Sequence, residues 1–182
     1  MTLTIRPAEA RDDAAMAEIY APSVRERPVS FELEPPDAAE IGVRRQRVTA
    51  IFPWLVATDG ETVLGYCYAG PFAERAAYRW SVTTTVYVRD GLHRRGIGRA
   101  LYGELLPLLR RQGAVMAFAG ITLPNDGSVG LHRAMGFEPV GVYPRAGFKL
   151  GRWWDVAWYG LALREVAPDE VPAELVPWPQ LA

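Results

Sequence analysis

Apolar and polar positions along this chain alternate between a period of two, typical of strands, and a period near 3.6, typical of helices. Strand patterns cover residues 3–6, 54–57, 62–69, 82–88, 115–123, 138–142 and 154–163. Helix patterns cover residues 14–20, 35–47, 96–109 and 128–135, and we expect the first of these helices to end near Pro22. Strands and helices that alternate in this way predict an α/β fold.

Two connections predict how the strands pair. Asp59-Gly60 separates the strands at 54–57 and 62–69, which is typical of a hairpin and makes these strands antiparallel. The strands at 82–88 and 115–123 are joined through a helix, and a crossover of this length indicates parallel neighbours with a right-handed connection. We therefore expect a mixed, largely antiparallel central sheet with one parallel strand pair and flanking helices.

The composition is that of an ordinary globular chain. Its 182 residues are 49% hydrophobic and 23% charged, and suit one domain that buries roughly 70% of its unfolded surface. We expect a single domain over residues 1–165 and an extended arm over 166–182, where Pro168, Pro172, Pro177 and Pro179 exclude a continuous helix. A formal net charge of −1 provides no general attraction to nucleic acid or to an anionic membrane.

Targeting and redox features are few. The first residues contain no apolar signal region, and no apolar run approaches the roughly 18 residues of a membrane span. We therefore expect a cytoplasmic protein without membrane or nucleic-acid partners. The single cysteine, Cys67, excludes an internal disulfide and a cysteine-built zinc site, and its place in an apolar strand favours a core position.

The segment from residue 84 to 109 has the pattern of an anion-binding turn. A strand is followed by a polar loop at 89–95, and Gly96-Ile97-Gly98 then opens a helix. Glycines let backbone N–H groups approach an anion, the helix start adds a positive dipole end, and Arg94, Arg95 and Arg99 add charge. Leu101 stands where the dinucleotide fingerprint needs a third glycine, and the Gly-Lys-Ser/Thr of a P-loop is absent. A pyrophosphate site of another kind fits this pattern, and the alternative is a loop that only connects strand to helix.

The loop sequence resembles a known motif. His93-Arg94-Arg95-Gly96-Ile97-Gly98 is similar to the Gln/Arg-x-x-Gly-x-Gly/Ala motif of the Gcn5-related N-acetyltransferases (GNAT), with His93 at the first position. Further segments resemble the phosphinothricin acetyltransferase branch of that superfamily: Trp80, Thr85-Val86-Tyr87-Val88, Leu123-Pro124-Asn125-Asp126, His132, Gly136-Phe137, Ala146-Gly147-Phe148-Lys149 and Trp153-Trp154-Asp155. The resemblance covers nearly the whole chain.

This resemblance implies an acyl-CoA N-acyltransferase fold, in which the parallel strand pair is splayed. It implies transfer of an acetyl group from acetyl-coenzyme A to the α-amino group of small acidic amino acids, including phosphinothricin and methionine sulfoximine or sulfone, by a homodimer that needs no metal. The cofactor-binding residues that it implies are Val86, Val88, Arg94, Arg95, Gly96, Ile97, Gly98, Arg99, Asn125 and Ser128. Asn125 also suits the turn Pro124-Asn125-Asp126-Gly127.

The chemistry requires a neutral amine, whereas an alkylamine is mostly protonated at neutral pH. In the family a glutamate two residues before the Thr-Val-Tyr-Val run removes this proton, and here that position is Thr83. Three explanations are open. Proximity alone carries the reaction, another carboxylate such as Glu32 or Glu74 serves as the base, or the chain binds acetyl-coenzyme A as a sensor with little turnover.

The resemblance also indicates residues on the acceptor side. Arg75 matches an arginine that faces the acid groups of the substrate, and on this resemblance we expect that role rather than a surface pair with Glu74. Ala73 stands where a second basic residue is expected. Phe31 and Tyr87 are expected near the substrate. His132 could protonate the departing thiolate, hydrogen-bond the pantetheine arm, or be a buried histidine bonded to backbone.

A late aromatic set could in principle stack nucleobases or a cofactor. It consists of Trp153, Trp154, Trp158 and Tyr159, close to Arg152. At a period of two, however, these residues cover both faces of a final strand. We therefore expect them to make core and dimer contacts.

Overall fold

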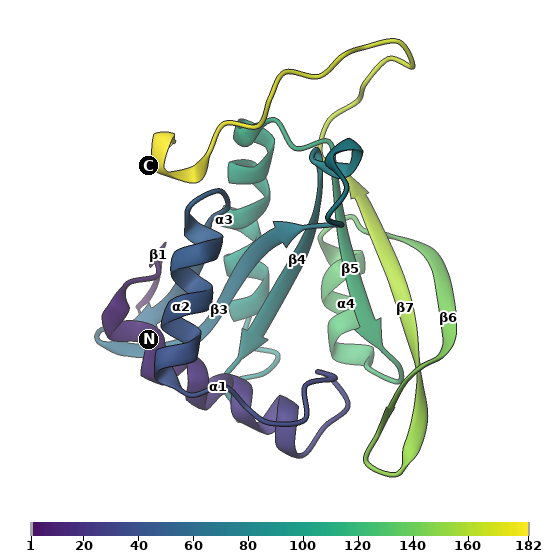
Figure 1. Cartoon of the computed structure of the whole chain (residues 1–182). Coiled ribbons are helices and arrows are strands. Elements are labelled where there is room, and N and C mark those ends of the chain that lie inside the picture. The colour runs from purple at the N-terminus through teal and green to yellow at the C-terminus, as the bar shows by residue number, and fades with distance from the viewer. Residues whose placement is uncertain (1, 182) are drawn as a thin grey trace.

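The computed structural model describes residues 2–181, so Met1 and Ala182, the outer ends of the expected domain and arm, lie outside the described residues. Seven strands form one sheet in the order β1-β2-β3-β4-β5-β7-β6 (Figure 1). They are β1 (Leu3–Pro7), β2 (Trp54–Asp59), β3 (Thr62–Pro71), β4 (Ser81–Val88), β5 (Met116–Thr122), β6 (Glu138–Lys149) and β7 (Arg152–Ala162). Only β4 and β5 pair in parallel, and this confirms the expected mixed sheet.

Two layers of helices cover the sheet. The helices are α1 (Asp13–Arg25), α2 (Ala38–Thr49), α3 (Ile97–Gln112) and α4 (Asp126–Ala134), with short 3-10 turns η1 (Ala10–Asp12), η2 (Ala76–Tyr78) and η3 (Trp178–Gln180). The pair α1 and α2 lies on one face of the sheet, and α3 and α4 lie on the other (Figure 1). The expected end of the first helix at Pro22 is wrong. A proline removes one helical hydrogen bond and crowds the preceding turn, but the packed helix tolerates this and α1 continues to Arg25.

Local sequence explains where the helices near the site begin. The side chain of Asp37 accepts a hydrogen bond from the Glu40 amide and caps α2, and the side chain of Asn125 does the same for the Ser128 amide at α4. Gly96 precedes α3 with a φ of +81°, a left-handed conformation that glycine adopts without strain. These caps determine which backbone N–H groups face the end of the sheet.

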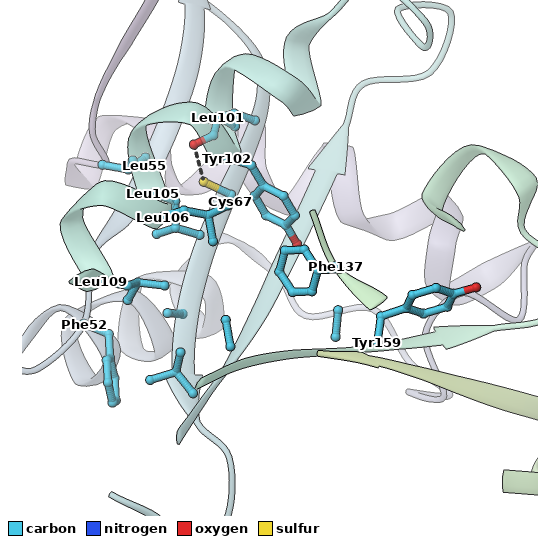
Figure 2. Close-up of a cluster of buried hydrophobic side chains, with 14 of the residues drawn as sticks. Phe52, Leu55, Cys67, Leu101, Tyr102, Leu105, Leu106, Leu109, Phe137 and Tyr159 are labelled. Carbon is cyan, nitrogen blue, oxygen red and sulfur yellow. Dashed lines mark hydrogen bonds between the residues drawn. The ribbon is translucent and has the colours of Figure 1, made fainter. Parts of the chain in front are cut away.

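The core has two parts because successive side chains of β2, β3 and β4 point to opposite faces. On one face, Leu101 and Leu105 of α3 pack against Leu55 of β2 and Cys67 of β3 (Figure 2). Cys67 is fully buried, with its Sγ 3.6 Å from the carbonyl oxygen of Leu101, which confirms its core position. On the other face, α1 and α2 cover an aromatic cluster that includes Trp54 and Tyr66. Replacing a buried leucine such as Leu105 by alanine would cost about 2–5 kcal/mol.

The helices α1 and α2 are held together at one buried ion pair. The Arg45 guanidinium donates to both carboxylate oxygens of Asp13, at 2.7 and 3.0 Å. At Gly42 an added Cβ would lie 2.8 Å from Asp13 Oδ2, so a side chain there would collide with the pair. The ion pair therefore requires a glycine at this position of α2.

The strands β4 and β5 diverge along their length. They pair only at Ser81–Met116, Val82–Ala117 and Thr83–Phe118. Beyond these pairs β4 still bonds to β3, and β5 still bonds to β7. The backbone of residues 84–88 therefore has no strand partner on its β5 side, and a V-shaped gap opens toward the start of α3 (Figure 1).

The last two strands form a long hairpin at the edge of the sheet. The strand β6 extends well beyond the expected residues 138–142, because its pairing with β7 resumes at Gly147 after an interruption at Pro144, Arg145 and Ala146. Residues 143–149 have the proline, glycine and charge of a loop. They form part of a strand because they pair with β7.

The C-terminal segment crosses the opposite end of the sheet from the gap (Figure 1). The indole nitrogen of Trp80 donates to the carbonyl of Ala173, and the amide of Val176 donates to the carbonyl of Gln112. Leu175 packs against the core formed by α3. Among residues 2–181, none of the helices has the length and apolar character needed to cross a membrane.

Candidate active site

A cavity of about 700 Å³ opens at the wide end of the gap between β4 and β5. Its walls come from the end of β4, the start of α3, the start of α4 and the loop after α1. Most of the residues expected to bind the cofactor line it, namely Val86, Val88, Arg94, Gly96, Ile97, Gly98, Arg99, Asn125 and Ser128, together with Tyr87 from the acceptor side. Arg95 does not line the cavity; its side chain is exposed on the loop.

The loop before α3 has the geometry of an anion site. Arg94 and Gly96 adopt positive φ values of +61° and +81°, which turn the chain sharply into the helix. The first N–H groups of an α-helix have no intrahelical acceptor, and the helix dipole makes this end positive. At Gly98 an added Cβ would lie 3.0 Å from Leu131 Cδ2 of α4, so a larger side chain would narrow the cavity. Backbone donors, glycines and arginines together suit a pyrophosphate.

A smaller cavity of about 100 Å³ lies inside the gap itself. Its walls are residues 84–87 of β4, residues 119–122 of β5, Val29 of the loop after α1, Asn125 and Ser128 at the start of α4, and His132 in its last turn. Because the β4 backbone has no strand partner here, its amide and carbonyl groups can bond an extended ligand as another strand would. Asn125 both caps α4 and lines the two cavities, so its two expected roles are compatible.

His132 is buried, with 3% of its surface exposed. Its Nδ1 lies 2.8 Å from the carbonyl oxygen of Ser128 and its Nε2 lies 3.1 Å from the Tyr102 hydroxyl. A carbonyl only accepts, so Nδ1 carries the proton and donates to Ser128, while the Tyr102 hydroxyl donates to Thr84 Oγ1. Burial lowers the pKa of His132, which favours the neutral ring. This geometry favours the buried histidine bonded to backbone over the proton donor.

Tyr102 and Thr84 belong to the same network, although the sequence did not single them out. The Tyr102 hydroxyl lies 3.2 Å from Thr84 Oγ1, and both residues are buried. Their only sequence signal is position: Tyr102 lies on the apolar face of α3, and Thr84 alternates with Val82 and Val86 on β4. A polar side chain on an otherwise apolar stripe is the sign that could have identified them.

Thr83 lies at the vertex of the gap, as the last β4 residue paired with β5. Its hydroxyl is 3.4 Å from the carbonyl oxygen of Gly70 on β3, to which it donates. Thr83, Thr85 and Tyr87 alternate along the strand and face α1 and α2, whereas Thr84 faces α3. Thr83 lines neither cavity.

The other expected substrate residues come from separate loops and also lie outside both cavity walls. Arg75 is exposed at the start of η2, in the connection that precedes β4. Phe31, with 39% of its surface exposed, lies in the loop between α1 and α2. The structure therefore brings Tyr87 to the cofactor residues, whereas Phe31, Arg75 and Thr83 line neither cavity.

Glu32, a candidate base, is already hydrogen-bonded to two other side chains. Its carboxylate accepts two hydrogen bonds from Arg44, at 2.7 and 3.1 Å, and one from the Tyr20 hydroxyl at 2.8 Å. Partial burial acts to raise its pKa, but the bonds from Arg44 and Tyr20 outweigh it and the pKa of Glu32 is lowered. A carboxylate held in its charged form in this way is a weak base for an ammonium group. Glu74, the other candidate, is exposed on the connection before η2.

Tyr20, which contacts the Glu32 carboxylate, belongs to a cluster of four tyrosines together with Tyr66, Tyr68 and Tyr87. The Tyr20 and Tyr87 ring centroids are 4.8 Å apart, and those of Tyr66 and Tyr87 are 5.5 Å apart. Burial raises the pKa of Tyr66 and Tyr87 well above the usual value for a phenol, so they stay neutral. The alternation of Tyr66 and Tyr68 along one strand was the sequence signal for this cluster. The sequence alone did not show that Tyr20 joins it.

The late aromatic residues are divided between core and surface. Tyr159 is buried in the core, and Trp158 packs against Phe72 and Tyr143. Trp153 is 57% exposed, and Trp154 lies under the Arg152 guanidinium at 3.7 Å. The packing of Trp158 and Tyr159 confirms the expected core contacts. The expected dimer contacts of the exposed residues stay a prediction.

Comparison with known proteins agrees with this geometry. The family model for the acetyltransferase (GNAT) domain matches residues 5–158. A phosphinothricin N-acetyltransferase of Streptomyces coelicolor is 40% identical over 159 residues, which cover 85% of this chain and 93% of the relative. An L-methionine sulfoximine/L-methionine sulfone acetyltransferase of Pseudomonas aeruginosa is 36% identical over 170 residues, which cover 90% and 96%.

A solved structure gives the same result. The crystal structure of a GNAT superfamily phosphinothricin acetyltransferase from Sinorhizobium meliloti, in complex with acetyl-coenzyme A, superposes with a TM-score of 0.90 and 37% identity, covering 98% of this chain and 97% of that chain. The chain therefore belongs to the GNAT acetyltransferases, enzymes that use acetyl-coenzyme A. Within this family its relatives place it in the phosphinothricin acetyltransferase branch, as the resemblance implied.

Proposed function

We propose that this enzyme acetylates the α-amino group of a small acidic amino acid or analogue of the phosphinothricin, methionine sulfoximine or methionine sulfone type. The observation that carries the proposal is the continuous wall from the loop before α3 to the gap between β4 and β5, which suits a long ligand with a phosphate end and a reactive end. The names of the Streptomyces and Pseudomonas relatives support the acceptor class.

In this proposal the cofactor runs along the larger cavity. The amides at Gly96, Ile97 and Gly98 hold the pyrophosphate, with Arg94 and Arg99 as countercharges and Arg95 on the outer side of the loop. The pantetheine arm bonds the free edge of β4 at Val86 and Val88 and contacts Asn125 and Ser128. The acetyl group then points into the smaller cavity inside the gap.

The acceptor approaches from the rim, between Phe31, Arg75 and Tyr87. The exposed guanidinium of Arg75 supplies a two-pronged donor for a carboxylate or phosphinate. Thr83 at the vertex accepts or orients the amine but cannot hold its proton. We propose that the amine loses its proton to solvent and that orientation, worth roughly 7–11 kcal/mol, carries the reaction. A proton donated to the thiolate by His132 would require the ring to give up the tautomer that the Ser128 carbonyl holds.

The second candidate function is an acetyl-coenzyme A sensor, and Thr83 in place of a carboxylate favours it. A thiol-release assay across a panel of free amino acids and neutral amines, combined with calorimetry of acetyl-coenzyme A binding, separates the two. Turnover that is fastest with acidic amino acids supports the enzyme. Tight binding of acetyl-coenzyme A without thiol release for any acceptor supports the sensor.

We further propose that two copies pair through the β6–β7 hairpin, as the resemblance implied. Apolar side chains gather there on the edge of the sheet, including Val142, Tyr143, Phe148 and Trp153, each more than half exposed. Surfaces of this kind mark interaction sites. Light scattering after size exclusion tests the pairing, and Trp153→Glu should yield the monomer. The cytoplasmic location, and the lack of a metal, membrane or nucleic-acid partner, stay predictions.

A further inference from the structure

Lys149 is the only lysine of this chain; all the other basic residues among its 20 are arginines. It lies at the end of β6 and is 6% exposed, whereas lysine is almost never buried unless it is paired. Its ammonium donates a 2.6 Å hydrogen bond to the backbone carbonyl of Ser30, a residue 119 positions earlier. Burial lowers the pKa of Lys149, and the charge of Glu32 opposes that shift.

Ser30 belongs to the loop of residues 26–37 that joins α1 to α2. One side of this loop is tied to the first half of the chain. Arg27 donates to both oxygens of Asp90, in the connection between β4 and α3, at 2.9 and 2.6 Å. Glu32 accepts from Arg44 of α2 and from Tyr20 of α1.

The other side of the loop is tied to the second half of the chain, across the gap. The Phe31 ring lies so close above Gly147 of β6 that an added Cβ would be 2.5 Å from it. The Lys149 bond to Ser30 lies two residues further along the same strand. The loop thus bridges the open end of the gap, from the connection before α3 to the β6–β7 hairpin (Figure 1).

This bridge forms part of the cavity wall. Arg27, Pro28 and Val29 line the larger cavity, and Val29 also lines the smaller one. The Ser30 carbonyl that Lys149 holds follows directly after Val29. A movement of this loop therefore changes the shape of both cavities at the point where they meet.

We propose that Lys149 is a positioning residue, a latch that holds the 26–37 loop closed over the acetyl-coenzyme A and acceptor site. The proposal rests on the proposed function for the ligands it names, but the latch itself is a contact within the chain. Lysine suits the task because its compact ammonium fits a buried site and keeps further N–H donors beside the charge of Glu32. An open loop makes only a fraction of molecules competent to bind, which weakens apparent affinity by that fraction.

The test compares Lys149→Met, which keeps an unbranched apolar stem and removes the ammonium, with Arg47→Met, which removes one positive charge from the exposed side of α2. Hydrogen exchange followed by mass spectrometry reports on residues 26–37. We expect exchange there to rise about tenfold in Lys149→Met, the loss expected for one charge-assisted hydrogen bond. KM for acetyl-coenzyme A and for the acceptor should rise by about the same factor, with kcat changed by less than about twofold. Arg47→Met should match wild type in all of these measurements.

A second variant tests the same contact in case Lys149→Met does not fold. Gly147→Ala leaves Lys149 in place and pushes the Phe31 ring away, so exchange of the same residues should rise by a smaller factor. Unchanged exchange of residues 26–37 in both variants would overturn the latch. Increased exchange with unchanged acetyl-coenzyme A affinity, measured by calorimetry, would overturn its link to the site. A wild-type protein that binds acetyl-coenzyme A but acetylates no amino acid contradicts the proposed function and leaves the exchange and affinity results to decide the latch.

Discussion

The cofactor side and the acceptor side of this site are built in different ways. The cofactor side is nearly continuous in sequence: residues 86–99 contribute a strand end, a loop and a helix start. The proposed acceptor side draws on Phe31, Arg75 and Thr83, which lie in different elements and loops. A pyrophosphate is bound by backbone amides, which a local turn can present, whereas an acidic amino acid is recognised by side chains that the fold must gather.

The difference indicates which part of such a site a single substitution can alter. Changing the cofactor side requires a change in backbone geometry, because positive φ values and glycines without side chains form it. Changing the acceptor side requires only a side chain, as the threonine at the vertex of the gap illustrates. The four predictions below test this contrast, starting with the largest expected effect.

The largest effect is expected at the cofactor side. Gly98→Glu should abolish measurable acetyl-coenzyme A binding, because a carboxylate would meet the phosphates and its Cβ would press on Leu131 at 3.0 Å. Calorimetry on the folded variant measures this. Gly103→Glu is the control, since it lies on the same helix with no atom within 4 Å of its Cβ. Undiminished affinity of Gly98→Glu would mean that the loop is only a connector.

The second prediction concerns the missing base. If the pocket has the geometry of the family, Thr83→Glu should raise kcat/KM near pH 7, by up to ~10²–10⁴-fold for an aligned general base. The advantage should shrink toward pH 9 and above, where more of the amine is already neutral. Pre-steady-state rates of thiol release measure the chemical step.

Thr83→Val is the control for that experiment, because it keeps the branched shape and removes the hydroxyl that bonds Gly70. A large loss in Thr83→Val would show that the hydroxyl orients a water or the amine. A wild-type rate that is flat from pH 7 to 9 and falls only near pH 6 would contradict the proximity mechanism and indicate a base elsewhere in the protein.

The third prediction concerns Arg75. Arg75→Ala should raise KM for an acidic amino acid by about tenfold, since one charge-assisted hydrogen bond is lost. KM for a neutral amine should change little. Equal effects on both acceptors would be inconsistent with a role in binding the acid group.

The smallest effect is expected for the buried histidine on the cofactor side. The pKa of His132 is lowered in the fold, so between that value and its usual 6.5 the unfolded chain binds more protons. The contribution of His132 to the free energy of unfolding is therefore fully present above pH 6.5, and it is lost as the pH falls toward the lowered pKa. Thermal unfolding measured from pH 7 to 5 should show this decline in wild type and a flatter profile in His132→Gln. The chain has one other histidine, the exposed His93, and His93→Gln should keep the wild-type decline.

The sequence alone determined the element types, the hairpin at Asp59-Gly60, the parallel β4–β5 pair and the glycine loop that opens α3, all of which the structure confirms. Each of these depends on residues close together in the chain, where periodicity, glycine and capping chemistry act directly. The same local signals misplaced the end of α1 at Pro22 and shortened β6, because a packed helix tolerates one proline and a partner strand orders a loop-like stretch.

Only the tertiary structure decided the chemistry of the side chains. The sequence left three roles open for His132, and its burial and its hydrogen bond to the Ser128 carbonyl now favour the buried, neutral ring. It offered Glu32 as a base, and Arg44 and Tyr20 engage that carboxylate. It grouped Lys149 with a family segment, and the fold placed it against Ser30, 119 residues away. A side chain's protonation and partners depend on burial and on groups brought from distant parts of the chain, and neither is visible in the local pattern.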